Sequence, residues 1–152
     1  MELEIPDAAA MEQLGARIAA HCHAGARIFL QGALGTGKTT LVRGFLRGLG
    51  YDGFVKSPTF TLIEPYRASG RDIYHIDLYR MQEAAELESI GLRDYFDQEG
   101  ICLVEWPEKG GAALGRPDLH ITLSFLEGSG RCAVLEGQSP VGQAILEVMS
   151  DE

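Results

Sequence analysis

The spacing of apolar residues changes several times along this 152-residue chain, and each change marks a structural element. Between Asp7 and Gly25 they recur every three or four positions, which predicts a helix capped by the Asp7 side chain. Residues 26–31 form a short apolar run that is typical of a buried strand. A glycine-rich loop follows, and residues 38–49 then have the period of a second helix, with Gly50 where a left-handed residue ends it.

The rest of the chain predicts hairpins, helices and another buried strand. The expected elements are strands at 59–66 and 72–80, a helix at 83–95 interrupted at Gly91, a strand at 101–105, strands at 119–126 and 131–136, and a helix at 141–149. Strands that alternate with helices and hairpins in this way predict an α/β fold, a three-layer sandwich around a mixed β-sheet with antiparallel hairpins. The length is that of a single domain over residues 1–152.

The composition is ordinary for a globular protein, with 45% hydrophobic and 23% charged residues, and it narrows the classes of function. A formal net charge of −9 disfavours a free-standing nucleic-acid-binding module, because affinity for a phosphate backbone depends on cationic contacts. The apolar runs are too short for a membrane span, and the N-terminal residues are acidic where a signal peptide would be cationic. Three widely spaced cysteines fit neither a disulfide framework nor a zinc site, so we expect a cytoplasmic protein.

The strongest chemical signal is the segment GALGTGKT, residues 32–39, which fits the phosphate-loop pattern GxxxxGK[ST] between a predicted strand and a predicted helix. Glycines let the backbone curl so that successive N–H groups face a phosphate chain, and the N-terminus of the following helix attracts anions. In this pattern Lys38 pairs with the outer phosphates, and the Thr39 hydroxyl is a ligand of Mg²⁺. The motif therefore predicts that the chain binds a nucleoside triphosphate.

Two predicted strands end in an acid that could serve this site. Glu105 ends the more apolar strand, so we assign it to Mg²⁺. We place Asp77 beside the γ-phosphate, where it would orient the attacking water or sense the phosphate; either acid could instead be a solvated charge. His75 is predicted on the same strand face as Asp77, as a site residue or as a partly buried structural histidine. Residues 57–59 are either a switch segment or an ordinary loop.

Several segments together resemble the bacterial TsaE family, formerly called YjeE. They are GALGTGKTTLVRGFLRGLG, VKSPTFTLIEPY, YHIDLYR, ELESIGLRDYF and ICLVEWPEKG, in the order and at the separations expected of that family. The phosphate loop is shared with many proteins, whereas SPTFTL, HIDLYR and VEWP together are specific to this family. The resemblance implies a P-loop NTPase-like fold and a small ATPase, with ATP and Mg²⁺ as cofactors, that hydrolyses ATP slowly on its own.

The resemblance also implies a pathway and partners. Members of this family contribute to the synthesis of threonylcarbamoyladenosine in tRNA and work with the TsaD and TsaB subunits. Those subunits transfer a threonylcarbamoyl group to the adenosine 3′ of the anticodon in tRNAs that read codons beginning with A. The ATP cycle is thought to reset that transferase complex. Contact with tRNA is implied only through these partners, and contact with a membrane is not implied.

Site residues follow from the resemblance as well. Asp77 and Lys38 are expected to act in hydrolysis, and Thr39 and Glu105 to hold the metal. The residues expected to contact the nucleotide are Gly32, Leu34, Gly35, Thr36, Gly37, Lys38, Thr39, Thr40, Asp77 and Arg131. The family's N-terminal contact, near Asp7, matches loosely, and Arg80 and Arg131 are the candidates for a charge clamp on the transition state.

Two other functions compete with this reading. In a small-molecule or nucleoside kinase, Asp77 would be the base that accepts a hydroxyl proton, and the phosphoryl group would pass to that hydroxyl. In a nucleotide-sensing adaptor without enzymatic activity, phosphate would not be released under any condition. What receives the phosphoryl group therefore distinguishes the three.

Overall fold

The computed structural model describes residues 1–83, 85–89, 91–96 and 99–152 of the chain. The strands are β1 (Glu2–Ile5), β2 (Arg27–Gln31), β3 (Ile63–Ala68), β4 (Arg71–Asp77), β5 (Ile101–Glu105), β6 (Leu119–Phe125) and β7 (Arg131–Gly137). The helices are α1 (Ala8–Ala20), α2 (Lys38–Gly48), α3 (Glu86–Ser89), α4 (Leu92–Phe96) and α5 (Pro140–Ser150), with short 3-10 turns η1 (Pro107–Lys109) and η2 (Gly111–Leu114).

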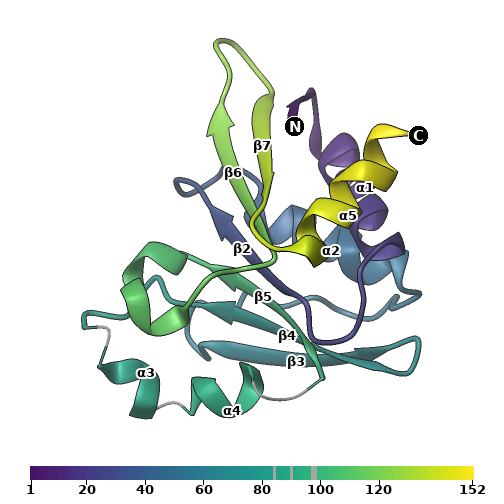
Figure 1. Ribbon diagram of the computed structural model, residues 1–152. Coiled ribbons are helices and arrows are strands. Elements are labelled where there is room, and N and C mark those ends of the chain that lie inside the picture. The colour runs from purple at the N-terminus through teal and green to yellow at the C-terminus, as the bar shows by residue number, and fades with distance from the viewer. Residues whose placement is uncertain (84, 90, 97–98) are drawn as a thin grey trace.

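The strands form one mixed sheet in the order β1-β7-β6-β2-β5-β4-β3 (Figure 1). β2 runs parallel to β5 and to β6, and β4 runs parallel to β5. The pairs β3–β4, β6–β7 and β1–β7 are antiparallel. The strand that precedes the phosphate loop therefore lies in the middle of the sheet, and its neighbour β5 ends at the same edge, where open α/β sheets bind their ligands.

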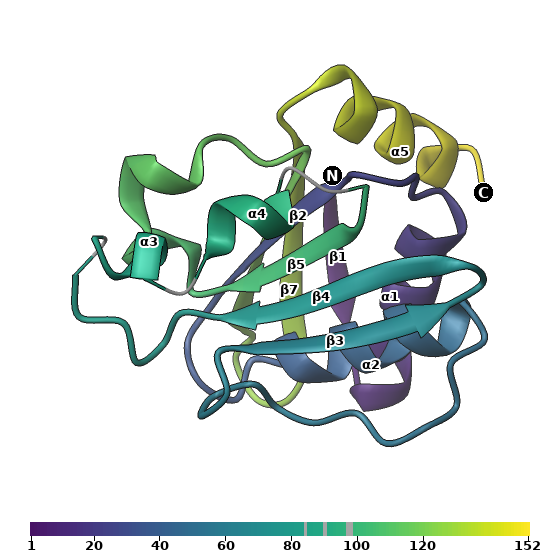
Figure 2. The same ribbon diagram turned by 90° about the horizontal axis from the view of Figure 1, so that it is seen from below.

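Side chains alternate between the two faces of the sheet, and each face has its own hydrophobic cluster. Ile28 and Leu30 of β2 pack in the cluster that contains the buried faces of α1, α2 and α5. Phe29, between them, packs in the second cluster, with Leu87 of α3 and Leu92 of α4. Figures 1 and 2 show the two groups of helices on opposite sides of the sheet. The predicted α/β sandwich around a mixed sheet is confirmed.

α1 and α2 pack closely because glycines remove the side chains between them. A Cβ on Gly44 would lie 2.1 Å from the carbonyl oxygen of Glu12, and one on Gly15 would lie 2.1 Å from the carbonyl oxygen of Leu41. The N-terminal cap of α1 matches the prediction, since the Asp7 side chain accepts a hydrogen bond from the backbone N–H of Ala10 at 2.8 Å. The helix ends at Ala20, earlier than the predicted end near Gly25. This packing fixes the N-terminal end of α2 against the sheet, directly after the phosphate loop.

The first hairpin differs from the prediction at both ends. Its strands extend to Ala68 and Arg71 around a two-residue turn in which Ser69 and Gly70 both have positive φ, the geometry that favours tight hairpins. The first strand begins at residue 63 rather than 59, because residues 58–61 form a turn closed by a hydrogen bond from the N–H of Leu62 to the carbonyl of Pro58. The turn at residues 58–61 brings Thr59 within hydrogen-bond distance of Asp77.

The sequence pattern missed one strand and predicted one interrupted helix correctly. β1 was not predicted; it pairs with β7, with Glu2 opposite Val134 and Ile5 opposite Arg131. The helix expected over 83–95 is interrupted at Gly91 as predicted: α3 and α4 lie on either side of it, and Gly91 has φ 70. A positive φ cannot continue a right-handed helix, which explains the interruption. Residues 84 and 90 of that prediction lie outside the described residues.

Among the described residues, no helix is long and apolar enough to span a membrane.

Candidate functional site

The backbone of the phosphate loop has a conformation that only glycine adopts without strain. Gly35 has φ 83 and Gly37 has φ 105, both in the left-handed region. At Gly32 the constraint is space, because a Cβ there would lie 2.7 Å from the carbonyl oxygen of Leu123 on β6. Gly37 is also the N-cap of α2 and has no side chain to bond the first N–H groups of that helix. The loop therefore presents free backbone donors where an anion would lie.

Lys38 is buried at the start of α2, with 5% of its surface exposed. Its Nζ donates a hydrogen bond to the carbonyl oxygen of Gly32 and lies 3.8 Å from the centre of the Trp106 ring. Burial lowers the pKa of this ammonium below its ordinary value of 10.5, although the Glu105 and Asp77 carboxylates oppose the shift. The positive charge is therefore held in a poorly solvated place, where a phosphate would be a strong partner.

Glu105 and Asp77 are neighbours because β4 and β5 are parallel and in register. Asp77 pairs directly with Glu105 at the carboxyl ends of these strands, and both side chains are buried. Across the gap to α2, the Thr39 hydroxyl donates to Oε2 of Glu105 at 3.3 Å. A hydroxyl and a carboxylate at this separation are the oxygen ligands that Mg²⁺ prefers. The two side chains thus fit a magnesium ion, and phosphates and water would supply its other ligands.

The residues near the second acid come from a loop that the sequence pattern left undecided. Asp77 accepts a hydrogen bond at Oδ1 from the backbone N–H of Tyr79 at 2.9 Å, and at Oδ2 from the Thr59 hydroxyl at 3.2 Å. Ser57 is hydrogen-bonded in turn to Thr59, at 2.9 Å. Burial raises the pKa of Asp77 above its ordinary value of 3.8, and these hydrogen bonds partly oppose that effect. The segment 57–59 therefore reaches the site and contacts the acid directly.

These side chains surround a cavity of about 270 Å³ at the carboxyl edge of the sheet. It is lined by Leu34, Gly35, Gly37, Lys38, Thr39, Thr40, Ser57, Thr59, Asp77, Tyr79, Glu105 and Trp106. Eight of these belong to the residues that the sequence and the resemblance predict for the nucleotide or the metal. Tyr79 was not predicted, because its approach depends on how the chain turns after Asp77.

Three predicted residues have other positions. Gly32 does not line the cavity, and its carbonyl oxygen accepts the Lys38 hydrogen bond. The Thr36 side chain is fully buried, and both its hydroxyl, at 2.7 Å, and its backbone N–H, at 3.3 Å, donate to the carbonyl of Ala33. Arg131 lines a neighbouring cavity of about 160 Å³, which shares three residues of the phosphate loop and α2 with the first and also includes Asp7.

Trp106 follows Glu105 with φ 57, an uncommon conformation for a residue with a side chain. In this conformation its ring packs against both Lys38 and Tyr79, with 5.0 Å between the two aromatic ring centres. The ring thus forms one wall of the cavity beside the ammonium. The sequence favoured packing of Trp106 against the loop, which its contact with Lys38 confirms, but a left-handed backbone at a non-glycine residue has no sequence signature.

His75 lies on β4, two positions before Asp77, and is fully buried. Its Nε2 is 2.5 Å from Oε2 of Glu105, which is therefore in contact with both His75 and Thr39. Among the described residues, His75 Nδ1 has no hydrogen-bond partner. Of the two readings open from the sequence, the structure places this histidine in direct contact with a predicted site residue.

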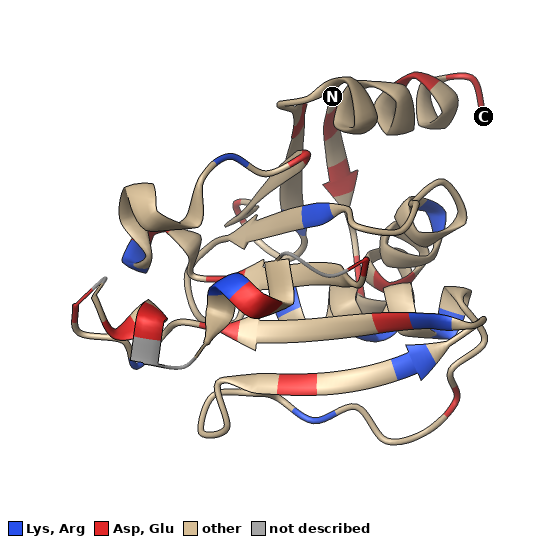
Figure 3. Ribbon diagram, turned by 60° about the horizontal axis from the view of Figure 1, so that its bottom comes forward, with Lys and Arg blue, Asp and Glu red and all other residues tan. Residues whose placement is uncertain are grey.

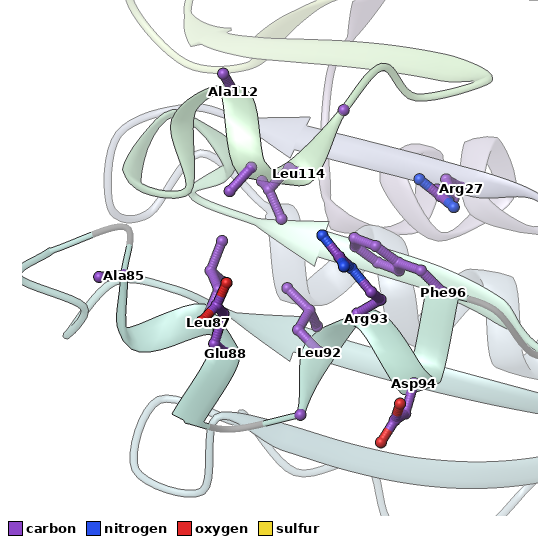
Figure 4. Close-up of a pocket in the computed structure, with 13 residues that line it drawn as sticks. Arg27, Ala85, Leu87, Glu88, Leu92, Arg93, Asp94, Phe96, Ala112 and Leu114 are labelled. Atoms are coloured by element: carbon purple, nitrogen blue, oxygen red, sulfur yellow. The ribbon is translucent and has the colours of Figure 1, made fainter.

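A larger cavity, of about 540 Å³, lies on the face of the sheet that α3 and α4 cover (Figure 4). Its apolar part is formed by Leu87, Leu92 and Leu114, and Arg27 stacks on the Phe96 ring at 4.4 Å at one end. None of the residues predicted for the nucleotide or the metal lines it. The smaller cavity at the phosphate loop is therefore the candidate site.

The comparisons with known proteins agree with this geometry. The family model described as "Threonylcarbamoyl adenosine biosynthesis protein TsaE" matches residues 5–133. The chain is 41% identical to the Haemophilus influenzae tRNA threonylcarbamoyladenosine biosynthesis protein TsaE over 152 aligned residues, which cover 97% of this chain and 96% of that protein. It is 44% identical to the Synechocystis protein of the same name over 113 residues, or 72% of this chain and 71% of the relative.

A solved structure gives the same result for the fold. The crystal structure of Bacillus subtilis YdiB superposes with a TM-score of 0.84 and 28% identity, over 99% of this chain and 94% of that one. The family match covers most of the chain, from β1 to β7, and includes the phosphate loop with both acids opposite it. We conclude that this chain belongs to the TsaE family.

Proposed function

We propose that this protein binds ATP with Mg²⁺, hydrolyses it slowly on its own, and acts with the TsaD–TsaB transferase in forming the threonylcarbamoyl group on the adenosine 3′ of the tRNA anticodon. The observation that carries the ATPase part is the convergence of Lys38, Thr39, Asp77 and Glu105 on one cavity from three separate elements. The pathway is supported by the printed names of the relatives and of the family model.

Each side chain has a distinct task in this proposal. The loop N–H groups and Lys38 bind the phosphates, and Thr39 and Glu105 hold the metal. When bound, Mg²⁺ would neutralise charge on the outer phosphates. Asp77 lies beside Glu105 and orients a water through a second lone pair of Oδ1 or Oδ2, since each oxygen already accepts one hydrogen bond, from Tyr79 and Thr59 respectively.

The slow rate expected of the protein alone has a structural basis. Among the described residues that line the cavity, Lys38 is the one cation, and no arginine is present. Arg131 donates to the carbonyl of Gly35 at 3.1 Å in the neighbouring cavity, and Arg80 stacks on Phe60 at 4.1 Å. An arginine that stabilises charge in the transition state accelerates phosphoryl transfer by about 10³–10⁵. A partner that supplies or repositions such a charge would therefore activate the enzyme.

Phosphate release from ATP tests the proposal directly. The purified protein with Mg²⁺ and ATP should release inorganic phosphate slowly, and the addition of TsaD and TsaB should raise the rate. A nucleoside kinase would instead phosphorylate an added nucleoside and release no free phosphate. A nucleotide-sensing adaptor would release none in single-turnover reactions, even with both partners present. Either of these results would overturn the ATPase assignment.

A further inference from the structure

We infer that His75 is a positioning residue for the metal site: its Nε2–H holds the Glu105 carboxylate in the orientation in which it meets Thr39. The inference rests on the proposed function, because it assigns this task relative to Mg²⁺-dependent nucleotide binding. It concerns a residue other than those of the phosphate loop and the two acids at the strand ends. His75 itself does not line the cavity, so it would act only through Glu105.

The first observation is how completely the pair is enclosed. His75 has no exposed surface and Glu105 has 3%. The two residues lie on adjacent parallel strands, with His75 opposite Leu103, so the imidazole lies one step below the carboxylate on the same face. A buried carboxylate needs donors, because the ionised group has lost its water. At 2.5 Å, the ring nitrogen is the nearer of the two side-chain donors to Glu105, since the Thr39 hydroxyl is at 3.3 Å.

The second observation fixes which ring nitrogen carries the proton. Nδ1 of His75 is buried and has no hydrogen-bond partner among the described residues. A proton on Nδ1 would be a buried donor without an acceptor, which is costly, whereas a bare nitrogen there loses less. A ring with a single proton therefore carries it on Nε2 and donates it to Glu105. Because Nε2 is the only ring nitrogen with an acceptor among the described residues, its hydrogen bond restrains the Glu105 carboxylate.

The third observation concerns which carboxylate oxygen is restrained. His75 and Thr39 both contact Oε2 of Glu105. Two contacts from different elements, β4 and α2, fix the rotation of the carboxylate. Hydrogen bonds from a second layer commonly orient metal ligands in this way, and their loss costs about 10–100-fold in metal affinity.

A purely structural role is the competing explanation, and the surroundings of His75 argue against it. The neighbouring position on the same strand face, Ile73, belongs to the hydrophobic cluster of α1 and α2. An apolar residue at position 75 would pack against the same face without burying a ring nitrogen that has no partner. The polar ring is thus explained by its contact with Glu105.

The test is calorimetric titration of a non-hydrolysable ATP analogue into the purified protein, once with Mg²⁺ and once with EDTA. The His75→Leu variant removes the donor at similar size. His75→Gln keeps an N–H near the position of Nε2. His120→Leu is the matched control, since it removes another sheet histidine, whose Nε2 pairs with Gln31 at 2.9 Å away from the acids. Thermal unfolding of each variant measures the structural effect separately.

We expect His75→Leu to weaken binding with Mg²⁺ by about tenfold or more and to leave binding in EDTA within about twofold. His75→Gln should recover most of the loss, and His120→Leu should change neither titration. In a Glu105→Gln background, His75→Leu should cost little further, because it acts through that carboxylate. Equal losses with Mg²⁺ and EDTA, or additive losses in the double variant, would overturn the inference.

A second readout needs no ligand. Nitrogen-15 NMR of the histidine rings in the ligand-free protein should show His75 protonated on Nε2 and bare on Nδ1, and Glu105→Ala should change its shifts. A ring protonated on Nδ1 alone, with a bare Nε2, would contradict the inference even if the proposed function is correct. Conversely, wild-type protein that binds the analogue equally with Mg²⁺ and with EDTA would refute the proposed metal dependence. The NMR measurement would still show which ring nitrogen of His75 carries the proton.

Discussion

At the scale of one residue, the buried ammonium of Lys38 favours phosphate binding but destabilises the ligand-free folded protein. Its ammonium is buried beside Trp106, and burial lowers its pKa despite two nearby carboxylates. A base whose pKa is lower in the folded state than in the unfolded chain is destabilising while it remains protonated. A bound phosphate would compensate for the lost hydration, which is why the charge is useful there.

Replacing Lys38 by methionine should therefore stabilise the ligand-free protein by roughly 1 kcal/mol and abolish tight ATP binding. Chemical unfolding and calorimetry measure the two effects. Lys109→Met is the control, because this exposed cation lies 5.8 Å from the Tyr79 ring and its removal should change stability by less than about 0.5 kcal/mol. A less stable Lys38→Met protein, or one that still binds ATP tightly, would contradict the assigned role.

The raised pKa of Asp77 predicts that protein stability decreases with rising pH over a defined range. Its pKa is raised above 3.8, so between pH 3.8 and the raised value the unfolded chain loses this proton before the folded protein does. The free energy of unfolding of the wild type therefore decreases as the pH rises from 3.8 to the raised pKa of Asp77. Above that pKa the full destabilisation from the buried Asp77 carboxylate is present.

The Asp77→Asn variant lacks this titration and should stop hydrolysis while it retains nucleotide binding. The difference in melting temperature between Asp77→Asn and wild type should rise in favour of the variant as the pH increases from below 3.8 through the raised pKa. A difference that is independent of pH, or one that shrinks, would show that burial of Asp77 does not disfavour its charge.

Those parts of the candidate site that depend on residue spacing along the chain could be predicted from the sequence. The phosphate loop is one continuous motif, and Glu105 and Asp77 each end a recognisable strand, so their meeting follows from parallel pairing. The contact of Thr59 with Asp77 and the position of Trp106 depend on positive φ angles at Leu62 and at Trp106 itself. Residues with side chains reach such angles only through tertiary contacts, which a local pattern does not contain.

At the scale of elements, the packing of α1 on α2 depends on missing side chains. An alanine in place of glycine inside a helix normally stabilises a protein by about 0.5–1 kcal/mol. At Gly44 the added Cβ would lie 2.1 Å from a backbone oxygen of α1, which cannot move without separating the helices. Steric overlap therefore outweighs helix propensity here.

We expect Gly44→Ala to destabilise the protein by about 2–3 kcal/mol in chemical unfolding. Arg43→Ala, at the preceding position of α2, is the matched control. It removes only an exposed ion pair with Glu12, at 3.7 Å, and should cost less than about 0.5 kcal/mol. Stabilisation of the Gly44→Ala protein would mean that the two helices are not in contact at this point.

The elements that sequence could predict are those with a strong period of their own. α1, α2 and β5 have continuous helical or apolar patterns, and their positions agree with the prediction to within a few residues. β1 has only four residues, Glu2–Ile5, and its pairing with β7 is decided by a partner more than a hundred positions away. The interruption at Gly91 that separates α3 from α4 was predicted as well, since glycine adopts its positive φ without strain.

For the whole molecule, the central position of β2 links the site to the core, so ligand binding should report on global stability. Mg²⁺ and a non-hydrolysable ATP analogue at about 100 times the dissociation constant should add about 2.7 kcal/mol to the free energy of unfolding. The melting temperature should then rise by several degrees in thermal scanning. The rise should be much smaller with EDTA and absent in the Lys38→Met variant, and an equal rise in that variant would place the ligand elsewhere.

The charges of the molecule are consistent with an indirect role in tRNA chemistry. Acidic residues outnumber basic ones by 22 to 13. Figure 3 shows the Lys and Arg positions scattered over several elements of the ribbon. A polyanion needs many neighbouring cations for tight binding, so the proposed partners, rather than this chain, would carry the contacts with tRNA.

The two outer strands of the sheet have a consequence for behaviour at high concentration. β1 carries Glu2 and Glu4, and β3 carries Pro65, which has no N–H to offer a further strand. Negative charge at one border and a proline at the other are devices by which natural sheets resist edge-to-edge aggregation. Replacing Pro65 by valine would therefore be the change most apt to turn this sheet into a template for fibril growth.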